Sequence, residues 1–482
     1  MELNKNTIGQ LFFTISILML MYMLINPLTQ VITNINEFFT LTLINFPISD
    51  ILHILGGETN PPLYFLLVKG LSKLANDFAI LKVFSIIPYA IVLILSTFKL
   101  RKDYGWLTAG LFALAIAAMS EFFITYSILR PYSWAMLFTL LSFIFFMDII
   151  TTANKTSFIL FTLFSVLASY THYYGLITAV VLYIILLFHI LTHNKDKIKY
   201  LAISMIAGIV LYAPWIPTLV KLLQSMNPLG DLTTDSIIQS FAHFAYSGDT
   251  LFSIITLIIL AIVLLIYLKE KDEDRTLVLY GIAAYFATVL VIILISIIIK
   301  PIMVTKGLVV ASAILWLAIS IMIGKMQNKR MLLISLSFVV LLLISGIGSM
   351  VVANGDAYQN GLAHTEALDQ IIEDNNSTII ITNPGLAMYL LDFADQSDMY
   401  CINQDYIYGE NMNRIHEIFN FKNIDKDEIA NFSTNNSNKN IYLVSWGNPD
   451  VNVEIEPVFK GDMTISKVNT TNLVNEDDEY YY

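Results

Sequence analysis

Long runs of apolar residues, separated by short polar segments, fill residues 1–354 of the chain. Runs of roughly 17–25 apolar residues are long enough to cross the hydrocarbon core of a bilayer as α-helices. The pattern predicts eleven transmembrane helices, at approximately residues 8–32, 80–98, 106–128, 133–150, 156–172, 174–192, 199–216, 251–268, 277–299, 306–323 and 331–352. The first run lacks a small-residue cleavage site, so we expect it to be retained as a span.

One apolar segment, Pro61–Leu74, does not fit this pattern of spans. It has only about 14 residues, and Lys69 and Lys73 stand at the i, i+4 spacing of one helix face. At about 1.5 Å per residue, such a helix is too short to cross a bilayer. We therefore expect it to be interfacial or partly inserted. If it crosses, the number of spans becomes twelve.

Composition agrees with a polytopic membrane protein, and the charge is unevenly divided. The 482 residues are 56% hydrophobic and 13% charged. Residues 355–482 hold 22 Asp and Glu against 6 Lys and Arg, a net charge of −16, whereas residues 1–354 hold 16 against 21, a net of +5. The acidic tail is predicted to be a separate, water-facing region, which argues against binding to nucleic acid or to anionic lipid headgroups. The single cysteine, Cys401, excludes an intramolecular disulfide and a cysteine-based metal cluster.

Basic residues between the apolar runs predict the orientation of the chain. They cluster at residues 101–102, 155, 195–199, 269–275 and 325–330, and they alternate with connections poor in Lys and Arg. Because short cytoplasmic loops are enriched in Lys and Arg, these clusters mark the cytoplasmic side. An odd number of spans then places the N-terminus in the cytoplasm and the acidic tail outside. The large outer segments are residues 33–79, 217–250 and 353–482.

Residues 355–482 carry the pattern of a small α/β domain. Thr365 is placed to cap a helix with Leu368, Ile371 and Ile372 on one face. "STIIITNPG" predicts a buried strand ended by a turn, and "NIYLVSWG" predicts another strand. The expected architecture is a polytopic α-helical membrane domain over residues 1–354, followed by an extracytoplasmic acidic α/β domain over residues 355–482.

Soluble nucleotide and hydrolase chemistry has no support in the sequence. The chain has no Walker loop, dinucleotide glycine fingerprint, His-Glu-x-x-His or Gly-x-Ser-x-Gly motif. Polar residues gather instead at the predicted outer face of the membrane. They lie in four segments: Asn36-Glu37 with Asp50 and Glu58, "ETNPPLY" at 58–64, "YSILRPYSW" at 126–134, and "SYTHYYG" at 169–175.

The order of these segments resembles a known family. "INEFFTLTLINFPISDILHILGGETNPPLYFLL" is similar to the first outer loop of GT-C glycosyltransferases of the protein-mannosyltransferase and aminoarabinose-transferase type, where an Asp-Glu pair precedes a His-Pro-Pro-Leu-Tyr sequence. "ITYSILRPYSW" resembles their Tyr-Ser-x-x-Ala-Arg-x-Tyr element, "YTHYYGL" a Thr-His-Tyr element, and "KPIMVTKGLVVASAILWL" a late Pro-x-x-x-x-Arg-Tyr element. The resemblance covers most of the membrane region in order. Asn36 replaces the family's Asp, Asn60 replaces its His, and Lys306-Gly307 replaces its Arg-Tyr.

This resemblance implies a GT-C fold and a polyprenyl-phosphate-dependent glycosyltransferase activity. Such an enzyme moves a sugar from a polyprenyl-phosphate donor to a glycan, lipid or protein acceptor, here at the outer face of a prokaryotic plasma membrane. A single in-line displacement would invert the anomeric carbon. The reaction needs a carboxylate that takes the proton of the acceptor and cationic groups that stabilise the departing phosphate.

The resemblance also implies roles for individual residues, with the active site in outer loop 33–79. Glu37 is the candidate catalytic base. The candidate substrate-binding residues are Asn36, Asn60, Tyr64, Lys69, Arg130, Tyr132, His172, Tyr173 and Lys306. The cationic residues and His172 would bind phosphate, and the tyrosines would line the sugar or lipid pocket. Arg130 suits phosphate because its planar guanidinium can bond two oxygens at once.

Simpler roles and other functions stay open. Glu37 could be a solvated loop carboxylate, Arg130 a side chain that reaches toward the membrane surface, and His172 part of an aromatic belt.

Carboxylates near phosphate would permit Mg²⁺ or Mn²⁺, although the sequence offers no convincing ligand set. A flippase or transporter of lipid-linked sugar would be expected to have paired broken helices in two repeated halves, and the sequence shows no such repeat. The departures from the family's motifs keep open a catalytically silent scaffold whose acidic module binds a partner.

Overall fold

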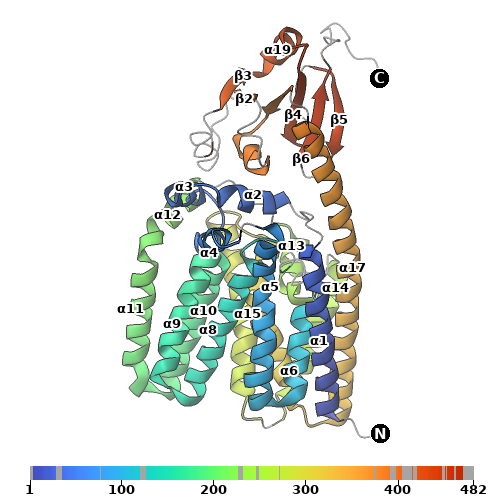
Figure 1. Ribbon diagram of the computed structural model, residues 1–482. Helices are drawn as coiled ribbons and strands as arrows, with labels where there is room; N and C mark the ends of the chain where they lie inside the picture. Colours follow the sequence, from blue (N-terminus) through green and yellow to red (C-terminus); the bar gives the residue numbers. More distant parts are fainter. Residues whose placement is uncertain are drawn as a thin grey trace. The chain divides into compact units, whose positions relative to one another are not determined.

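The computed structural model describes residues 4–28, 35–75, 77–119, 126, 128–225, 232–245, 249–270, 272–373, 376–390, 398–403, 415, 421–447, 451, 453–460 and 463–469. The chain divides into two compact units (Figure 1). The first unit holds residues 1–30 and 59–353, and the second holds residues 31–58 and 354–482. The predicted outer loop 33–79 is therefore divided between the two units.

The first unit is a helical bundle. Its helices are α1 (Lys5–Leu28), α4 (Leu63–Ser72), α5 (Phe78–Leu95), the π-helix η1 (Ser96–Leu100), α6 (Arg101–Ala118), α8 (Tyr132–Thr152), α9 (Lys155–Thr171), α10 (Tyr173–His193), α11 (Ile198–Tyr212), α12 (Ile216–Ser225), α13 (Thr234–Phe241), α14 (Thr250–Tyr267), α15 (Arg275–Ile298), α16 (Val309–Lys325) and the first part of α17 (Lys329–Glu373). Short 3-10 helices are η2 (Lys195–Lys197), η3 (Ala213–Trp215), η4 (His243–Ala245) and η5 (Thr305–Leu308).

Helix α16 forms the centre of this bundle. Every residue from Val309 to Ile323 is buried, and the indole of Trp316 donates to the Phe244 carbonyl oxygen at 2.9 Å. The helices around it expose large aliphatic side chains on their outer faces, such as Ile206 at 62% and Ile298 at 75%. An apolar outer face around an apolar core is expected of a bundle surrounded by lipid rather than by water.

The helices of the first unit correspond to the predicted spans, but the span predicted at residues 106–128 ends too late: α6 ends at Ala118, because the backbone of Met119 is extended (φ −72°, ψ 125°). Nine helices in the described part of the chain are long and apolar enough to cross a membrane. One of these segments, Phe78–Ala118, is broken by non-helical angles at Gly105 (φ 87°, ψ 173°), a conformation that glycine adopts without strain. Helix α9 has 17 residues, at the short end of the range for a span. With α9 and the break at Gly105, these helices account for the predicted segments and confirm a polytopic helical membrane protein.

Helices α1 and α6 cross at two glycines. A Cβ atom on Gly9 would collide with the Trp106 carbonyl group, and one on Gly110 would collide with the carbonyl oxygen of Gly9. Nearby, the Tyr89 hydroxyl of α5 lies 3.0 Å from the Ser16 carbonyl oxygen of α1. Small residues at a helix crossing let two backbones approach closely, which is a common way to pack helices in membranes.

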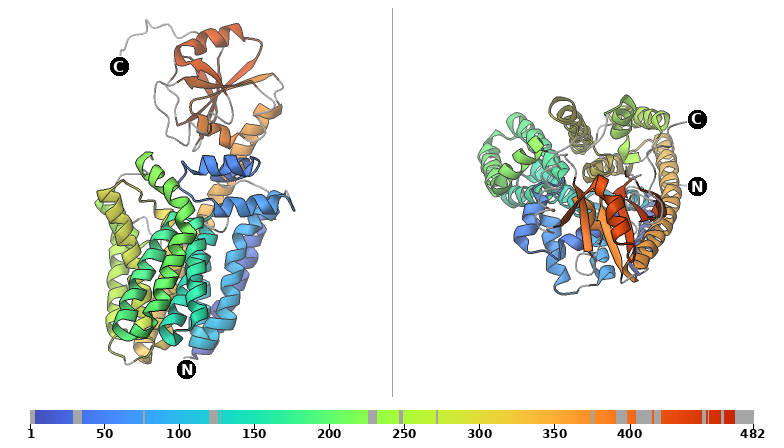
Figure 2. Two further views of the ribbon diagram at one scale, coloured as in Figure 1. Left: turned by 90° about the vertical axis from the view of Figure 1, so that its left-hand side faces the viewer. Right: turned by 90° about the horizontal axis from the view of Figure 1, so that it is seen from above.

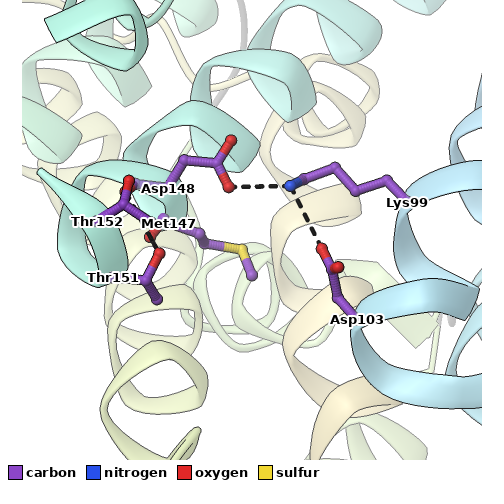
Figure 3. A network of polar contacts seen from close by, with 6 residues as sticks. All are labelled: Lys99, Asp103, Met147, Asp148, Thr151 and Thr152. Atoms are coloured by element: carbon purple, nitrogen blue, oxygen red, sulfur yellow. Dashed lines mark hydrogen bonds and ion pairs between the residues drawn. The ribbon is translucent and has the colours of Figure 1, made fainter. Parts of the chain in front are cut away.

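Ionic contacts tie together the chain reversals at one end of the bundle. Lys99 Nζ lies 2.9 Å from Asp148 Oδ1 at the end of α8 and 3.3 Å from Asp103 Oδ2 at the start of α6 (Figure 3). Lys5 Nζ donates to the Gly324 carbonyl oxygen at 2.8 Å, and Lys325 Nζ lies 2.6 Å from Asp274 Oδ2. Figure 1 shows that the helices joined by the predicted basic loops are connected at the end of the bundle where α1 begins.

Helix α4 lies at the opposite end of the bundle. It begins directly after Pro61-Pro62, and its 10 residues are too few for a span. Figure 1 shows it nearly end-on beside α5, which is seen lengthwise, so α4 runs across the bundle. The structure confirms a short helix in the predicted Pro61–Leu74 segment, while its position at the membrane interface stays a prediction.

The second unit is an α/β module. It contains α2 (Ile35–Leu43), α3 (Ile48–Leu55), the last part of α17, the 3-10 helix η6 (Pro384–Tyr389), α19 (Ile429–Asn435) and a six-stranded sheet. The strands are β1 (Ser377–Ile381), β2 (Asp398–Asn403), β3 (Lys422–Asp425), β4 (Asn440–Trp446), β5 (Ile455–Lys460) and β6 (Met463–Val468), in the order β3-β2-β1-β4-β6-β5. Figure 2 shows this sheet in two further views. The first four in this order pair in parallel, and β6 pairs antiparallel with β4 and β5.

Both predicted strands are present, as β1 and β4, but the predicted helix cap is wrong. Thr365 lies inside α17, which runs without interruption from Lys329 to Glu373, and its hydroxyl donates to the Gly361 carbonyl oxygen. The last span and the first helix of the tail are thus one helix. No proline stands between residues 329 and 373, so nothing in this stretch stops the helix.

Apolar residues cover both faces of the sheet. Ile379 and Ile381 of β1 belong to one cluster, and Ile380 between them belongs to the other, because successive strand side chains point to opposite faces. Ile429 of α19 belongs to the cluster with Ile380. The cluster with Ile379 includes Phe38 of α2. A sheet buried on both faces explains why β1 is a continuous apolar run.

Candidate functional site

A cavity of about 220 Å³ opens at the end of the first unit opposite the basic loops. It lies where α8 and α10 begin and where α15 ends. Its lining residues are Thr59, Asn60, Tyr132, His172, Tyr173, Tyr174, Leu176, Ile177, Leu219, Leu222, Leu223, Ile295, Ile299, Ile302, Val304 and Gly307. Four predicted substrate-binding residues therefore share one cavity: Asn60, Tyr132, His172 and Tyr173.

His172 forms the junction between α9 and α10. Its extended backbone (φ −156°, ψ 139°) ends α9, and its Nδ1 accepts a hydrogen bond from the Tyr174 backbone N–H at 3.1 Å, which caps α10. Burial, together with the nearby charge of Arg130, lowers the pKa of His172 to about 3. The imidazole is thus neutral at pH 7, and since Nδ1 is an acceptor, the proton lies on Nε2. His172 can therefore donate a hydrogen bond to a ligand, but it carries no positive charge.

Tyr174 holds the segment that precedes η5 against α10. Its hydroxyl donates to the Ile302 carbonyl oxygen and accepts from the Val304 N–H, both at 2.8 Å. Gly307 packs directly on this ring: a Cβ there would lie 2.5 Å from Tyr174 Cε2 and 3.2 Å from His172 Cε1. The glycine that follows Lys306 is therefore required by close packing at the wall of the cavity.

Asn60 lines the cavity with a buried amide side chain. It is only 3% exposed, and its Nδ2 lies 3.4 Å from Thr59 Oγ1. Within the described part of the chain, its buried Oδ1 has no hydrogen-bond partner. Leaving a buried carbonyl oxygen unsatisfied costs about 1–3 kcal/mol. A residue that lines the cavity and carries an unsatisfied polar atom is a candidate for binding a ligand.

Two tyrosines complete the polar wall. The ring of Tyr132 lies 5.4 Å from that of His172, and the Tyr173 hydroxyl accepts a hydrogen bond from Trp215 Nε1 at 3.1 Å. Both side chains are partly exposed. The cavity therefore combines aromatic rings with a few polar groups, as sites for small polar ligands commonly do.

Arg130 lies just outside the cavity lining. It directly precedes Pro131, the N-cap of α8, and it is only 7% exposed. Its guanidinium lies 5.8 Å from the centre of the Phe65 ring of α4. It stands two residues before Tyr132, which lines the cavity. A buried guanidinium beside a neutral cavity is suited to binding an anion.

The remaining predicted residues of the first unit do not line this cavity. Tyr64 is fully buried and its hydroxyl lies 3.0 Å from that of Ser85, which joins α4 to α5. Lys69 is partly exposed on α4, and Lys306 is exposed in η5. Burial, and to a smaller extent the charge of Lys73, lower the pKa of Lys69. Their substrate-binding roles stay predictions.

Asn36 and Glu37 belong to the second unit, in the first turn of α2. Glu37 has no exposed surface, whereas Asn36 is partly exposed and its carbonyl oxygen accepts from Thr40 Oγ1 at 3.4 Å. A carboxylate near a helix N-terminus is stabilised by the helix dipole. Full burial argues against the simpler role of Glu37 as a solvated loop carboxylate.

The sequence interpretation missed one charged residue. Lys82 of α5 has no exposed surface, and its ammonium lies 5.2 Å from the centre of the Phe78 ring. A lysine inside an apolar run is costly to bury unless it is paired or functional. The feature of the sequence that could have identified this residue is a single lysine within the apolar stretch "FAILKVF". Because it is a buried lysine of the first unit, we add Lys82 to the candidate cationic residues.

The described residues contain no group of three or more His, Cys, Asp or Glu side chains arranged to hold a metal ion. The predicted option of Mg²⁺ or Mn²⁺ thus gains no ligand set here. It stays an untested expectation, and no step proposed below involves a metal.

Comparisons with known proteins identify the fold. No protein-family model matches the chain, and no curated protein matches it. Two solved structures of ArnT from Cupriavidus metallidurans are similar to it. The apo structure has a TM-score of 0.53 and 10% identity, and the match covers 86% of this chain and 88% of that one. The structure bound to undecaprenyl phosphate has a TM-score of 0.58 and 10% identity, and the match covers 95% of this chain and 98% of that one. The chain therefore has an ArnT-like fold of the GT-C type, as its motifs predicted.

Proposed function

We propose that this protein is a glycosyltransferase that moves a sugar from a polyprenyl-phosphate donor to a glycan, lipid or protein acceptor. The observation that carries the proposal is the similarity of almost the whole chain to ArnT, which has been solved with undecaprenyl phosphate bound. The cavity that unites Asn60, Tyr132, His172 and Tyr173 supports it, because these residues come from the segments that resemble the family.

The proposed reaction is a single in-line displacement. The acceptor oxygen forms a bond to C1 of the sugar while the bond from C1 to the phosphate oxygen breaks. The proton of the acceptor passes to the Glu37 carboxylate, and the polyprenyl phosphate leaves with the electron pair. C1 is inverted because attack and departure occur on opposite faces.

The residues near the cavity would share the binding of the donor. The Arg130 guanidinium would stabilise the charge that develops on the phosphate. Neutral His172 would donate a hydrogen bond from Nε2, and the Asn60 carbonyl oxygen would accept one from a sugar hydroxyl. Two observations support this division of roles: Arg130 is buried, and the pKa of His172 is lowered so that its imidazole is neutral.

A second cavity suits the lipid portion of the donor. It has a volume of about 520 Å³ and lies between α9, α10, α11 and α12, with Tyr183, Met205, Gly208 and Tyr212 in its lining. Leu176 and Leu219 line both cavities. A prenyl chain that begins at the polar cavity could therefore continue into this apolar groove, where its burial is favourable.

The test is transfer of radiolabelled sugar from polyprenyl phosphate by the purified full-length protein. We expect label on an acceptor. We also expect Glu37→Gln to lower the rate by about 10²–10⁴-fold, because general base catalysis contributes this much. Asp50→Asn, the same change of acid to amide on α3, serves as the control and should retain activity.

Other outcomes would contradict specific parts of the proposal. Full activity of a folded Glu37→Gln variant would remove Glu37 as the base. Translocation of the donor without transfer would indicate a flippase, and binding with neither reaction would indicate a silent scaffold.

A further inference from the structure

The candidate base lies beside a residue that is built into the core of the α/β module. Glu37 and Phe38 are consecutive on α2, and both are buried, at 0% and 4% exposure. Consecutive helical residues point about 100° apart. The two side chains therefore leave α2 in different directions, and Phe38 belongs to the apolar cluster of the sheet.

Phe38 makes defined contacts within the second unit. Its ring meets the His364 ring of α17 edge-on, with centroids 5.0 Å apart and planes at 81°. The His364 ring lies 5.0 Å from that of Phe459 in β5. The same cluster contains Leu386 of η6 and Leu390, which directly follows η6. Helix α2 also contacts η6. Phe38 thus connects α2 with the sheet, with η6 and with the helix that continues from the last span.

Helix α2 needs such contacts in order to hold one position. It has only nine residues, and an isolated helix shorter than about 12–15 residues is marginal in water. Its geometry is therefore fixed by tertiary packing rather than by its own hydrogen bonds. Burial of a phenylalanine ring is among the largest apolar contributions that one side chain makes.

We propose that the C-terminal α/β module positions the catalytic base, and that Phe38 is the positioning residue through which it acts. This inference rests on the proposed function, since it assigns a role to the residue beside Glu37. The module would set the rate of the chemical step by holding α2 in position. In this view the acidic tail is part of the catalytic apparatus and not a separate binding domain.

The proposal predicts a separation of kinetic parameters. The described residues that line the polar cavity all belong to the first unit, so loss of the Phe38 ring should leave the KM for the donor within about twofold. The kcat should fall by about 10–100-fold, because a displacement of about 1 Å at a catalytic group can cost this much. Phe38→Leu, which keeps an apolar side chain in the cluster, should restore most of the rate lost in Phe38→Ala.

The experiment combines kinetics with hydrogen exchange on the full-length protein. Phe38→Ala should speed amide exchange in residues 35–43 while the helices of the first unit keep their wild-type protection. The control is Ile48→Ala on α3, where the side chain is 52% exposed, and it should change neither exchange nor kcat. If Phe38→Ala does not fold, Phe38→Leu takes its place: it should show a smaller but measurable rise in exchange of residues 35–43 together with a fall in kcat, and a change in neither would overturn the inference.

Two results would overturn the inference in an enzyme that transfers sugar. One is an unchanged exchange rate in residues 35–43 of Phe38→Ala, and the other is a wild-type kcat despite faster exchange. Absence of transfer by the wild-type protein would instead defeat the proposed function, so the two failures are distinguishable.

Discussion

At the scale of single residues, His172 shows how burial decides chemistry. The same side chain ends α9, caps α10 through Nδ1 and lines the polar cavity. Its burial removes the water that would stabilise an imidazolium, and the positive charge of Arg130 opposes a second cation. Phosphate binding at this site would thus depend on Arg130 for charge and on His172 for a directed hydrogen bond.

This burial predicts a pH-dependent stability. The pKa of His172 lies at about 3 in the folded protein and at about 6.5 when the chain is unfolded, so the unfolded state takes up the proton first. The stability that neutral His172 provides is complete above pH 6.5 and is lost progressively as the pH falls toward 3. We expect the thermal midpoint to fall more between pH 7 and pH 5 in the wild type than in His172→Asn, which keeps a capping side chain. Equal falls in both proteins would contradict the neutral assignment.

At the scale of elements, close contact between helices fixes the bundle more tightly than apolar burial alone. In lipid, apolar side chains gain little by leaving their surroundings for another helix, so packing contacts matter more. Gly9 and Gly110 provide such contact between α1 and α6.

Helix α17 shows a limit of predicting where a helix ends. A helix end cannot be placed from a capping residue alone when the chain can continue helically, as it does through Thr365.

Gly110→Ala should therefore destabilise the α1–α6 crossing. The added Cβ would meet the Gly9 carbonyl oxygen, and because this neighbour is backbone, the helices must move apart. We expect a loss of about 1–3 kcal/mol, the usual cost of overpacking. Thermal unfolding in detergent would measure it. The control is Gly348→Ala on α17, where a Cβ would meet nothing within 4 Å. A midpoint for Gly110→Ala equal to that of the control would show that the crossing is looser than described.

At the scale of the whole molecule, the distribution of charge bears on orientation. The basic loops lie at one end of the bundle, and the polar cavity lies at the other. The enrichment of Lys and Arg in cytoplasmic loops then predicts a cytoplasmic N-terminus and an outward-facing cavity. With eleven spans the acidic tail would also face outward, on the side where the proposed reaction takes place.

Cysteine labelling in intact cells tests this orientation. The native Cys401 is buried, so it should contribute little background. An introduced cysteine at Asp427→Cys, an exposed position of the tail, should react with a membrane-impermeant maleimide in intact cells. Lys102→Cys, which is exposed at the other end, should react only after lysis. Labelling of Lys102→Cys in intact cells would reverse the predicted topology.

The order of the motifs anticipated part of the candidate site. Asn60, Tyr132, His172 and Tyr173 line one cavity, as the resemblance implied for substrate-binding residues. Tyr64 instead packs against α5, and Lys82 went unnoticed because one lysine in an apolar run does not reveal whether it is buried or reaches the membrane surface. Spacing along the chain indicates which segments are functional, but it does not indicate which side chain of a helix faces a cavity.

The sequence by itself determined the fold class, the apolar segments that form the long helices, the basic loops and two strands of the tail, β1 and β4. These properties follow from the hydropathy and periodicity of contiguous residues, which lipid and backbone hydrogen bonding translate directly into helices. Only the tertiary structure decided that Tyr174 holds residues 302–304, that Gly307 must lack a side chain, that His172 is neutral and that Phe38 enters the core of the sheet. Each of these properties depends on contact between residues far apart in the chain, or on the loss of water that such contact causes. The sequence around a residue does not predict which distant group will bury it.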